Sequence, residues 1–105
     1  MLKIYPVLVQ LLRELAPQVS QIEKHDGDLG RQVRRALSSS VLNVAEGMYS
    51  RGRNRQARYH FAMGSLRETL AGFEVAEAFG YAPALSSEQR GRIDRVLGTL
   101  FKLVQ

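Results

Sequence analysis

The stretch LGRQVRRALSSSVLNVAEGM, residues 29–48, decides the fold class because its apolar side chains recur at intervals of three and four residues. This spacing places on one side of a helix the residues Leu29, Val33, Ala36, Leu37, Val41, Val44 and Met48. Just before the stretch, Asp26-Gly27-Asp28 supplies a turn and a residue suited to cap a helix start. Gly47 predicts where the helix ends. We therefore expect an amphipathic helix here.

The first segment, residues 4–22, has the same apolar spacing. Pro17 predicts a kink or break near Ala16, because a proline inside a helix removes a backbone hydrogen bond. Polar residues interrupt the segment. A signal peptide has an uninterrupted apolar region, so the segment is not expected to be one. No apolar run in the chain reaches the roughly 18 residues that a membrane helix needs. We therefore expect a cytoplasmic protein that does not contact a membrane.

Two more helices follow along the chain. The third is expected to be capped by Asn54 and to end at Gly80. The fourth begins after Ser86, which forms a capping-box pattern with Gln89. No segment alternates with a period of two residues, so no sheet is expected. The sequence predicts an all-α, antiparallel up-down four-helix bundle, a single domain of residues 1–105.

The third helix carries apolar residues on two opposite sides. One stripe consists of Tyr59, Met63, Leu66, Leu70 and Phe73. The second stripe consists of Phe61, Ser65, Gly72, Val75 and Phe79. A surface helix of a monomer needs only one stripe, so the second predicts contact with another subunit. Glu68 falls within the second stripe, where a carboxylate needs a partner. We expect that partner to be Arg35, Arg67 or an arginine of a neighbouring subunit.

Arginine is concentrated in residues 31–67, which contain eight arginines and one acid, Glu46. The net charge of this stretch is +7, whereas that of the whole chain is +5. The planar guanidinium matches phosphate pairwise, so the cluster predicts a polyanionic partner, most commonly nucleic acid. The predicted binding residues are Arg31, Arg34, Arg35, Arg51, Arg53, Arg55 and Arg58. The alternative is a solvated surface with internal ion pairs to Glu46, Glu68, Glu74 and Glu77.

Residues 49–54 are predicted to be a polar connector, and Arg51, Arg53 and Arg55 are expected to sit on a flexible connector that adapts to phosphates. Two tyrosines flank this region, and an exposed tyrosine stacks on unpaired bases. Tyr59 lies on the core stripe of the third helix and is expected to be buried. Tyr49 is therefore the tyrosine expected to reach a base.

Residues suited to catalysis are sparse. Without cysteine the chain has no disulfide framework, thiolate zinc site or cysteine nucleophile. The two histidines, His25 and His60, do not follow a glutamate by three residues as a di-iron bundle requires. Arg53 and Arg55 do precede His60 at the Arg-x4–6-His spacing of an all-helical class of ribonucleases, which leaves that activity as an alternative. We expect a protein without enzymatic activity, metal or cofactor.

Three sequence segments together resemble a known family. They are Arg34-Arg35-Ala36-Leu37-Ser38-Ser39-Ser40-Val41-Leu42-Asn43-Val44-Ala45-Glu46-Gly47, Gly64-Ser65-Leu66-Arg67-Glu68 and Phe79-Gly80-Tyr81. Residues 29–104 resemble the bacterial four-helix-bundle proteins encoded in intervening sequences of 23S ribosomal RNA genes. That family is related to the accessory variability determinant of diversity-generating retroelements.

The resemblance implies an up-down bundle assembled as a ring-like homopentamer, with no established enzymatic activity. In the retroelement branch it implies binding to nucleic acid and to a reverse transcriptase through a basic surface. The residues expected to fix helix register or subunit orientation are Asn43, Glu46, Gly47, Phe61, Ser65, Glu68, Gly72, Val75 and Phe79. A catalytic carboxylate pair among them is the alternative.

The predicted function is therefore that of a non-enzymatic homo-oligomer that binds the RNA or DNA backbone with low sequence specificity, RNA being the expected partner. The alternative is an interaction scaffold that docks a nucleic-acid enzyme such as a reverse transcriptase.

Overall fold

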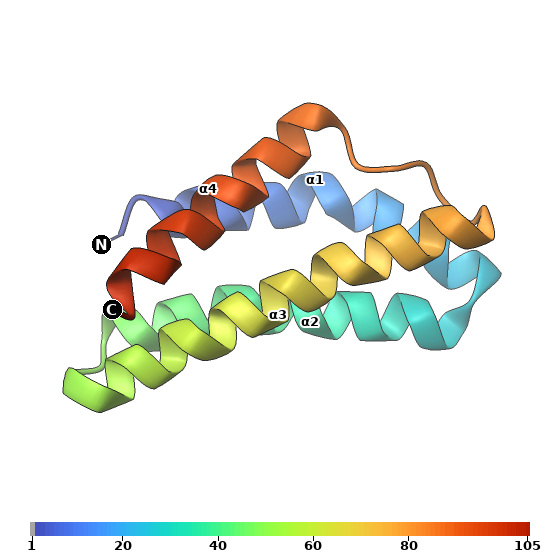
Figure 1. The fold of residues 1–105 in the computed structure, drawn as a ribbon. Coiled ribbons are helices and arrows are strands. Elements are labelled where there is room, and N and C mark those ends of the chain that lie inside the picture. The colour runs from blue at the N-terminus through green and yellow to red at the C-terminus, as the bar shows by residue number, and fades with distance from the viewer. Residues whose placement is uncertain (1) are drawn as a thin grey trace.

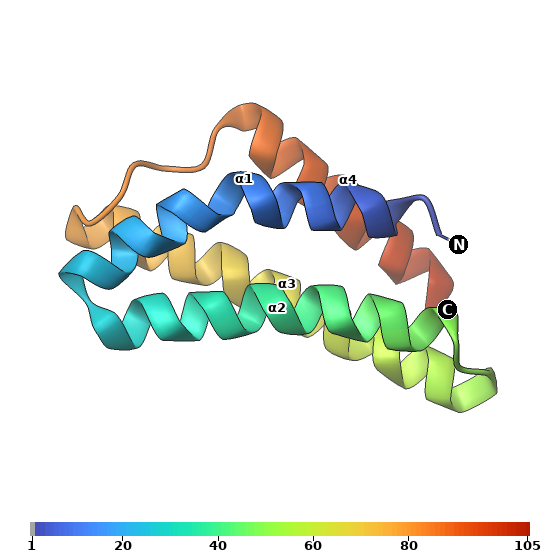
Figure 2. The same cartoon turned by 180° about the vertical axis from the view of Figure 1, so that it is seen from behind.

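The computed structural model describes residues 2–105 as four helices without a strand. The helices are α1 (Ile4–His25), α2 (Gly27–Met48), α3 (Gly52–Phe79) and α4 (Ser87–Leu103). They run alternately up and down, with α1 against α2, α2 against α3, α3 against α4, and α4 back against α1 (Figures 1 and 2). This arrangement confirms the predicted all-α class and the four-helix bundle.

Three helix boundaries are formed by the residues that the sequence indicates. The Asp26 carboxylate accepts a hydrogen bond from the Leu29 N–H at 3.0 Å and caps α2. Ser86 and Gln89 form the predicted capping box at α4, with reciprocal hydrogen bonds of 3.1 and 3.0 Å. α3 ends where Gly80 adopts a φ of 79°, a left-handed conformation that favours glycine. These predictions are confirmed.

A kink or break is predicted near Ala16, and of these the break is absent, because α1 continues through Pro17 as one helix. Its ribbon bends in the middle, which fits a kink, and does not separate into two helices (Figure 2). Leu15 and Val19 lie on either side of Pro17, and both are buried in the core. Tertiary packing of these side chains holds both halves of α1 in place despite the lost hydrogen bond.

The start of α3 also differs from the prediction. Asn54 does not cap the helix, because α3 begins two residues earlier at Gly52, whose φ is +57°. The N-cap position is Arg51, and its side chain makes no capping hydrogen bond. Residues 49–51 are all that remains of the expected connector, so Arg53 belongs to the first turn of a helix.

The core lies between the helices and contains the first stripe of α3, as predicted. Its largest fully buried side chains are Phe73, Leu8, Leu11, Leu15, Ile22, Leu66, Ile93, Leu100, Val19, Val33, Val44 and Val96. Phe101, which shares the apolar pattern of the last helix, is instead exposed.

Two glycines allow close packing of α2 against α3. A methyl group placed on Gly47 would lie 2.3 Å from Cε1 of Tyr59, whose side chain is only 3% exposed. A methyl group on Gly72 would lie 2.4 Å from Cγ2 of Val33. Gly47 is therefore not the helix terminator that the sequence predicts. α2 continues to Met48, and Gly47 makes room for the ring of Tyr59.

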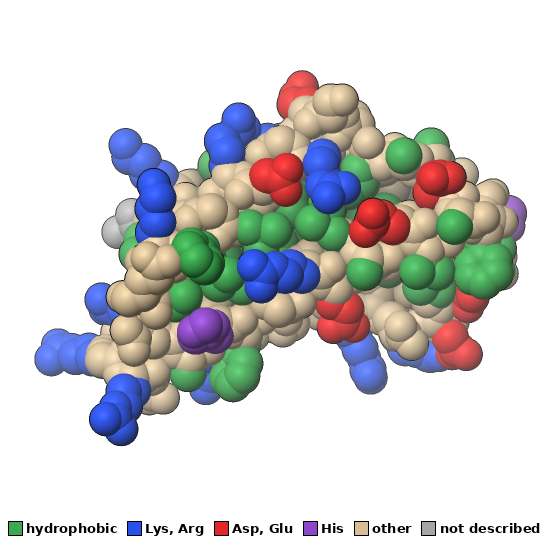
Figure 3. Space-filling view, viewed as in Figure 1, with side chains coloured by type: hydrophobic (Ala, Val, Ile, Leu, Met, Phe, Trp, Pro, Cys, Tyr) green, Lys and Arg blue, Asp and Glu red, His purple; other side chains and the backbone are tan. Residues whose placement is uncertain are grey.

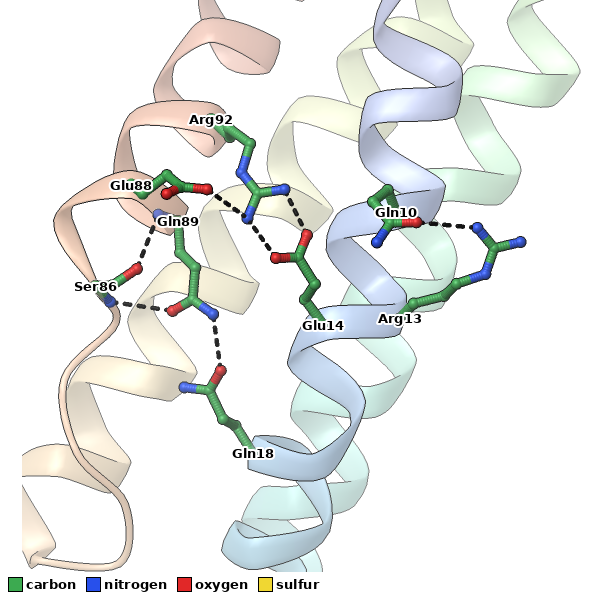
Figure 4. A network of polar contacts seen from close by, with 8 residues as sticks. All are labelled: Gln10, Arg13, Glu14, Gln18, Ser86, Glu88, Gln89 and Arg92. Atoms are coloured by element: carbon green, nitrogen blue, oxygen red, sulfur yellow. Dashed lines mark hydrogen bonds and ion pairs between the residues drawn. The ribbon is translucent and has the colours of Figure 1, made fainter.

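Polar side chains join α1 to α4 (Figure 4). Arg92 donates hydrogen bonds to both carboxylate oxygens of Glu14, at 2.5 and 2.9 Å. Nearby, the Gln89 amide donates to Gln18 at 3.0 Å. The hydrogen bonds from Arg92 lower the pKa of Glu14 below its ordinary value, although partial burial opposes the shift. α1 and α4 are thus joined by a charge-assisted pair as well as by apolar packing.

Candidate nucleic-acid interface

The up-down topology gathers three parts of the chain at one end of the bundle: the start of α1, the α2–α3 turn and the end of α4 (Figure 1). The Leu2 N–H lies 3.5 Å from Sδ of Met48, at the end of α2. Val104 packs against the core from the other terminus. We call this region the basic end, because it carries Lys3, Arg51, Arg53, Arg55, Arg58 and Lys102.

The basic end accounts for all the formal net charge of the chain. Its six cations face one acid, Glu46, which gives +5, and the nine other cations are balanced by nine acids. In Figure 3, Lys and Arg side chains surround the end that holds both termini, whereas the visible Asp and Glu side chains lie toward the middle and the other end. Such separation produces a directional field toward a polyanion.

The helix starts follow the same polarity. α1 and α3 start at the basic end with Lys3 and Arg51 as N-cap residues, and neither has a side-chain cap or an acid in its first turn. α2 and α4 start at the opposite end, where Asp26 and Ser86 accept hydrogen bonds from first-turn N–H groups. A helix N-terminus carries partial positive charge and a C-terminus partial negative charge, and α2 and α4 end where α1 and α3 start. The helix dipoles therefore offset one another at the basic end, and its positive potential comes from the side chains.

Two arginines of the basic end form hydrogen bonds within the chain. Nε of Arg55 donates to the carbonyl oxygens of Gly47 and Ser50, at 3.2 and 2.8 Å. Arg58 donates to the Asn43 side chain at 3.5 Å. The α2–α3 turn is therefore held by Arg55, and it is three residues long, 49–51, where the sequence predicts a connector of six.

The remaining predicted arginines lie elsewhere. Arg31, Arg34 and Arg35 belong to the first half of α2, and Arg35 lies thirteen positions before the end of α2 at Met48, which corresponds to about 20 Å along the helix axis. The structure thus divides the seven predicted arginines between two regions.

Two of these α2 arginines are already paired. Arg34 forms a two-pronged ion pair with Glu23 of α1, at 2.6 and 3.1 Å, and this pair lowers the pKa of Glu23. Arg31 pairs with Asp28 one turn away. Arg35 is exposed. Internal ion pairs therefore exist, but their acids are not the four glutamates expected from the sequence.

The second stripe of α3 lies on the outer face of the α2–α3 pair. Phe61 and Val75 are 58% and 42% exposed there, whereas Gly72 is buried against α2. A shallow groove of about 150 Å³ follows this face, lined by Leu29, Gln32, Val33, Glu68, Ala71, Gly72 and Val75. Apart from Gly72, this stripe is thus partly open to solvent in the single chain.

Hydrogen bonds cross the same face. The Ser65 hydroxyl donates to the Ser39 hydroxyl at 2.8 Å, and the Asn43 amide donates to the Ser39 carbonyl at 2.9 Å. The Ser65–Ser39 hydrogen bond links α3 to α2 and suits the register role predicted for Ser65. The Asn43–Ser39 bond lies within α2, and Asn43 meets α3 through the hydrogen bond that Arg58 donates to it. Glu46 is exposed beside them.

Glu68 does not have the predicted environment. Its side chain is exposed at the groove, and no ion pair with Arg35 or Arg67 forms among residues 2–105. Within one chain its carboxylate keeps its hydration, so it needs no partner.

Phe79 belongs to a separate feature at the end opposite the basic end. Its ring stacks on Tyr81 with centroids 5.2 Å apart, and Tyr81 stacks on His25 of α1 at 5.4 Å. The stack ties the end of α3 to the end of α1. Phe79 thus has an intramolecular partner that the two-stripe pattern does not reveal.

Two other features bear on chemistry. His60 is exposed on α3, and no group of three His, Asp or Glu side chains within residues 2–105 is placed to hold a metal ion.

A pocket of about 380 Å³ lies between α3 and α4. Its lining includes the apolar residues Leu70, Phe73 and Leu85 and the charged residues Glu74, Glu77 and Arg90.

Sequence reasoning missed Lys3 and Lys102 as members of the basic end. They are 99 residues apart, and only the fold brings them together. The signal was nevertheless available, because an up-down bundle with an even number of helices returns both termini to one end.

Comparison with protein-family models, curated proteins and solved structures finds no match to this chain. The resemblance of residues 29–104 to the ribosomal intervening-sequence family therefore stays a prediction. None of the helices in the described part of the chain is long and apolar enough to cross a membrane.

Proposed function

We propose that this protein binds the RNA or DNA backbone through its basic end, as a binding protein and not as an enzyme. The observation that carries the proposal is the location of the entire net charge of +5 at one end. Phosphate contacts fix position and orientation but carry no sequence information, so binding has low sequence specificity.

The residues of the basic end have different roles in this proposal. Arg51 and Arg53 are exposed, and they contact phosphates directly. Lys3 and Lys102 extend the positive surface onto α1 and α4. Arg55 and Arg58 hold the turn through their hydrogen bonds and add to the field.

The proposed site excludes Arg31 and Arg34. Their guanidinium groups are paired with Asp28 and Glu23, so a phosphate would have to displace a carboxylate. Arg35 lies on the same half of α2 and contributes only through the long-range field.

The salt dependence of binding tests the location of the site. The affinity for a labelled 20-nucleotide RNA of mixed sequence is measured by fluorescence anisotropy over a range of salt concentrations. For a single strand, each lost phosphate contact reduces the slope of log affinity against log salt by about 0.7. The Arg51→Ala, Arg53→Ala double variant is therefore expected to reduce this slope by about 1.4.

An Arg31→Ala, Arg90→Ala double variant is the matched control, since it removes the same charge from exposed ion pairs outside the basic end. The slope for this control is expected to match the wild-type slope. Equal reductions of the slope in the two double variants would show that binding is not localised at the basic end.

The proposal includes self-association through the outer face of α2 and α3. Exposed Phe61 and Val75 beside an apolar groove support it, and the family resemblance predicts a homopentamer. Five subunits would carry a charge of +25 and make weak contacts multivalent.

Native mass spectrometry tests the assembly. Phe61→Asp is expected to reduce the mass to that of one 11.8 kDa subunit, whereas Phe101→Asp, also at an exposed phenylalanine, is expected to leave the assembly intact. A wild-type monomer at micromolar concentration would contradict this part of the proposal.

The second candidate is a scaffold that docks a nucleic-acid enzyme such as a reverse transcriptase, and the same basic end supports it. The absorbance ratio of protein purified at low salt separates the two. Co-purifying nucleic acid favours direct binding.

The ribonuclease alternative has its own test, which is the length of an RNA after incubation with the protein. This alternative requires that the wild type cleaves the RNA and that His60→Ala does not.

A further inference from the structure

Tyr49 is the most exposed large apolar or aromatic side chain in the described part of the molecule, with 89% of its surface accessible. The other tyrosines differ, since Tyr59 is buried, Tyr81 is stacked between two rings and Tyr5 packs against the core. No aromatic ring within residues 2–105 stacks on Tyr49. Its ring is therefore free to receive a planar group from outside.

The backbone beneath this ring is firmly held. Tyr49 is the C-cap residue of α2, and its N–H donates to the Glu46 carbonyl at 3.2 Å. Nε of Arg55 bridges the carbonyls of Gly47 and Ser50, which flank Tyr49 in the chain. Because the backbone is already ordered, a ligand that stacks on the ring loses little free energy in fixing it.

The position of the ring gives it a specific use. Tyr49 lies on the α2–α3 turn of the basic end, two residues before Arg51 and four before Arg53, and both arginines are exposed. An aromatic face beside cations that follow a phosphate backbone is the usual arrangement for binding single strands. A duplex hides its base faces in the stack, so it can use the arginines but not the ring.

We propose that the basic end binds single-stranded nucleic acid in preference to duplex, with Tyr49 as a platform on which one unpaired base stacks. This inference rests on the proposed function and adds the strandedness of the ligand. The arginines bind phosphates of either form, and Tyr49 provides the difference between them.

The test compares a labelled 20-nucleotide oligothymidine with a 20-base-pair duplex of mixed sequence, by anisotropy at one salt concentration. Wild type is expected to bind the single strand more tightly. Tyr49→Ala is expected to weaken single-strand binding by about 5- to 150-fold, the range for one base–aromatic stack, and to leave duplex binding unchanged. The salt slope should not change, because no cation is removed.

Two further variants separate stacking from folding. Tyr49→Phe retains the ring and is expected to retain the affinity for the single strand. Phe79→Ala removes another exposed aromatic, at the opposite end, and is expected to leave both affinities unchanged. Since the chain has no tryptophan, tyrosine fluorescence reports directly: the single strand should quench it in wild type, and less so in Tyr49→Phe.

The outcomes are distinguishable. Equal wild-type affinity for the two ligands, or an unchanged single-strand affinity in Tyr49→Ala, would overturn this inference while leaving nucleic-acid binding intact. Failure of wild type to bind either ligand at low salt would overturn the proposed function, and this inference with it.

Discussion

The α2–α3 and α1–α4 interfaces belong to one bundle but are built by different physical means. α2 and α3 approach closely at Gly47 and Gly72, where added methyl groups would overlap neighbouring side chains. α1 and α4 are joined by the Arg92–Glu14 pair, in which Arg92 is only 14% exposed. The two interfaces should therefore respond to different perturbations, α2–α3 to side-chain volume and α1–α4 to charge.

The largest expected effect comes from filling the close contact between α2 and α3. Gly47→Ala places a methyl group against the ring of Tyr59, which is only 3% exposed, so the ring has to shift. Overpacking of this kind destabilises a protein by about 1–3 kcal/mol. For a domain of this size, each kcal/mol lowers Tm by about 4–8 °C, which calorimetry measures. An unchanged Tm would show that the ring moves freely and that the interface is loose.

A smaller loss is expected when the charge pair is removed. Arg92→Met keeps much of the apolar stem but deletes the hydrogen bonds to Glu14, so Tm should fall by less than in Gly47→Ala. Arg90→Met is the control on the same helix, because its contact with Asp94 is exposed and 3.7 Å long. Equal effects of the two substitutions would contradict a special role for the partly buried Arg92.

Acid should weaken the charged interface specifically. Hydrogen bonds from Arg92 lower the pKa of Glu14 in the folded protein below the ordinary value of 4.5, and Arg34 lowers that of Glu23. A lowered folded pKa stabilises the protein above the ordinary value, and this contribution is lost as pH falls through the folded pKa. Tm should therefore fall between about pH 5 and pH 2. Glu14→Gln should show a smaller fall, and identical profiles for variant and wild type would exclude this source.

The smallest expected effect is a gain. Gly98 lies in α4, where an added methyl group meets nothing within 4 Å. Gly98→Ala should stabilise the protein by about 0.5–1 kcal/mol, because alanine has a higher helix propensity than glycine. Urea denaturation should show this as a higher midpoint concentration. Gly64→Ala is the parallel case on α3. A loss of stability in either variant would mean that Gly64 or Gly98 is needed for packing although an added methyl group has open space there.

The sequence predicted the features that depend on neighbouring residues. Asp26 and Ser86 cap helices because their side chains reach N–H groups three residues ahead. Gly80 ends α3 because a left-handed residue is needed there. Both partners of each such interaction lie within one helical turn of each other, so the local sequence is enough to predict it.

The features that sequence reasoning missed depend on a partner far along the chain. Gly47 resembles a terminator until Tyr59 is placed against it, and Pro17 resembles a break until its neighbours are packed. Arg34 resembles a free cation, but Glu23 on the preceding helix neutralises it. In each case tertiary contact overrides the local preference.

The candidate site shows the same limit. The Arg51–Arg58 group was predictable because one short segment contains it. Its separation from Arg31 and Arg34 was not predictable, because the net charge of a segment does not show how far apart its arginines lie in the folded protein. Lys3 and Lys102 join the group only once the bundle is closed.

Leu2 lies near Met48, and Val104 packs against the core at the same end of the bundle. A fluorophore or affinity label attached near either residue would therefore crowd the arginines of the α2–α3 turn. Because the sequence has no cysteine, a single cysteine introduced at the exposed Gly27, on the far side of the bundle, would place one label away from those arginines.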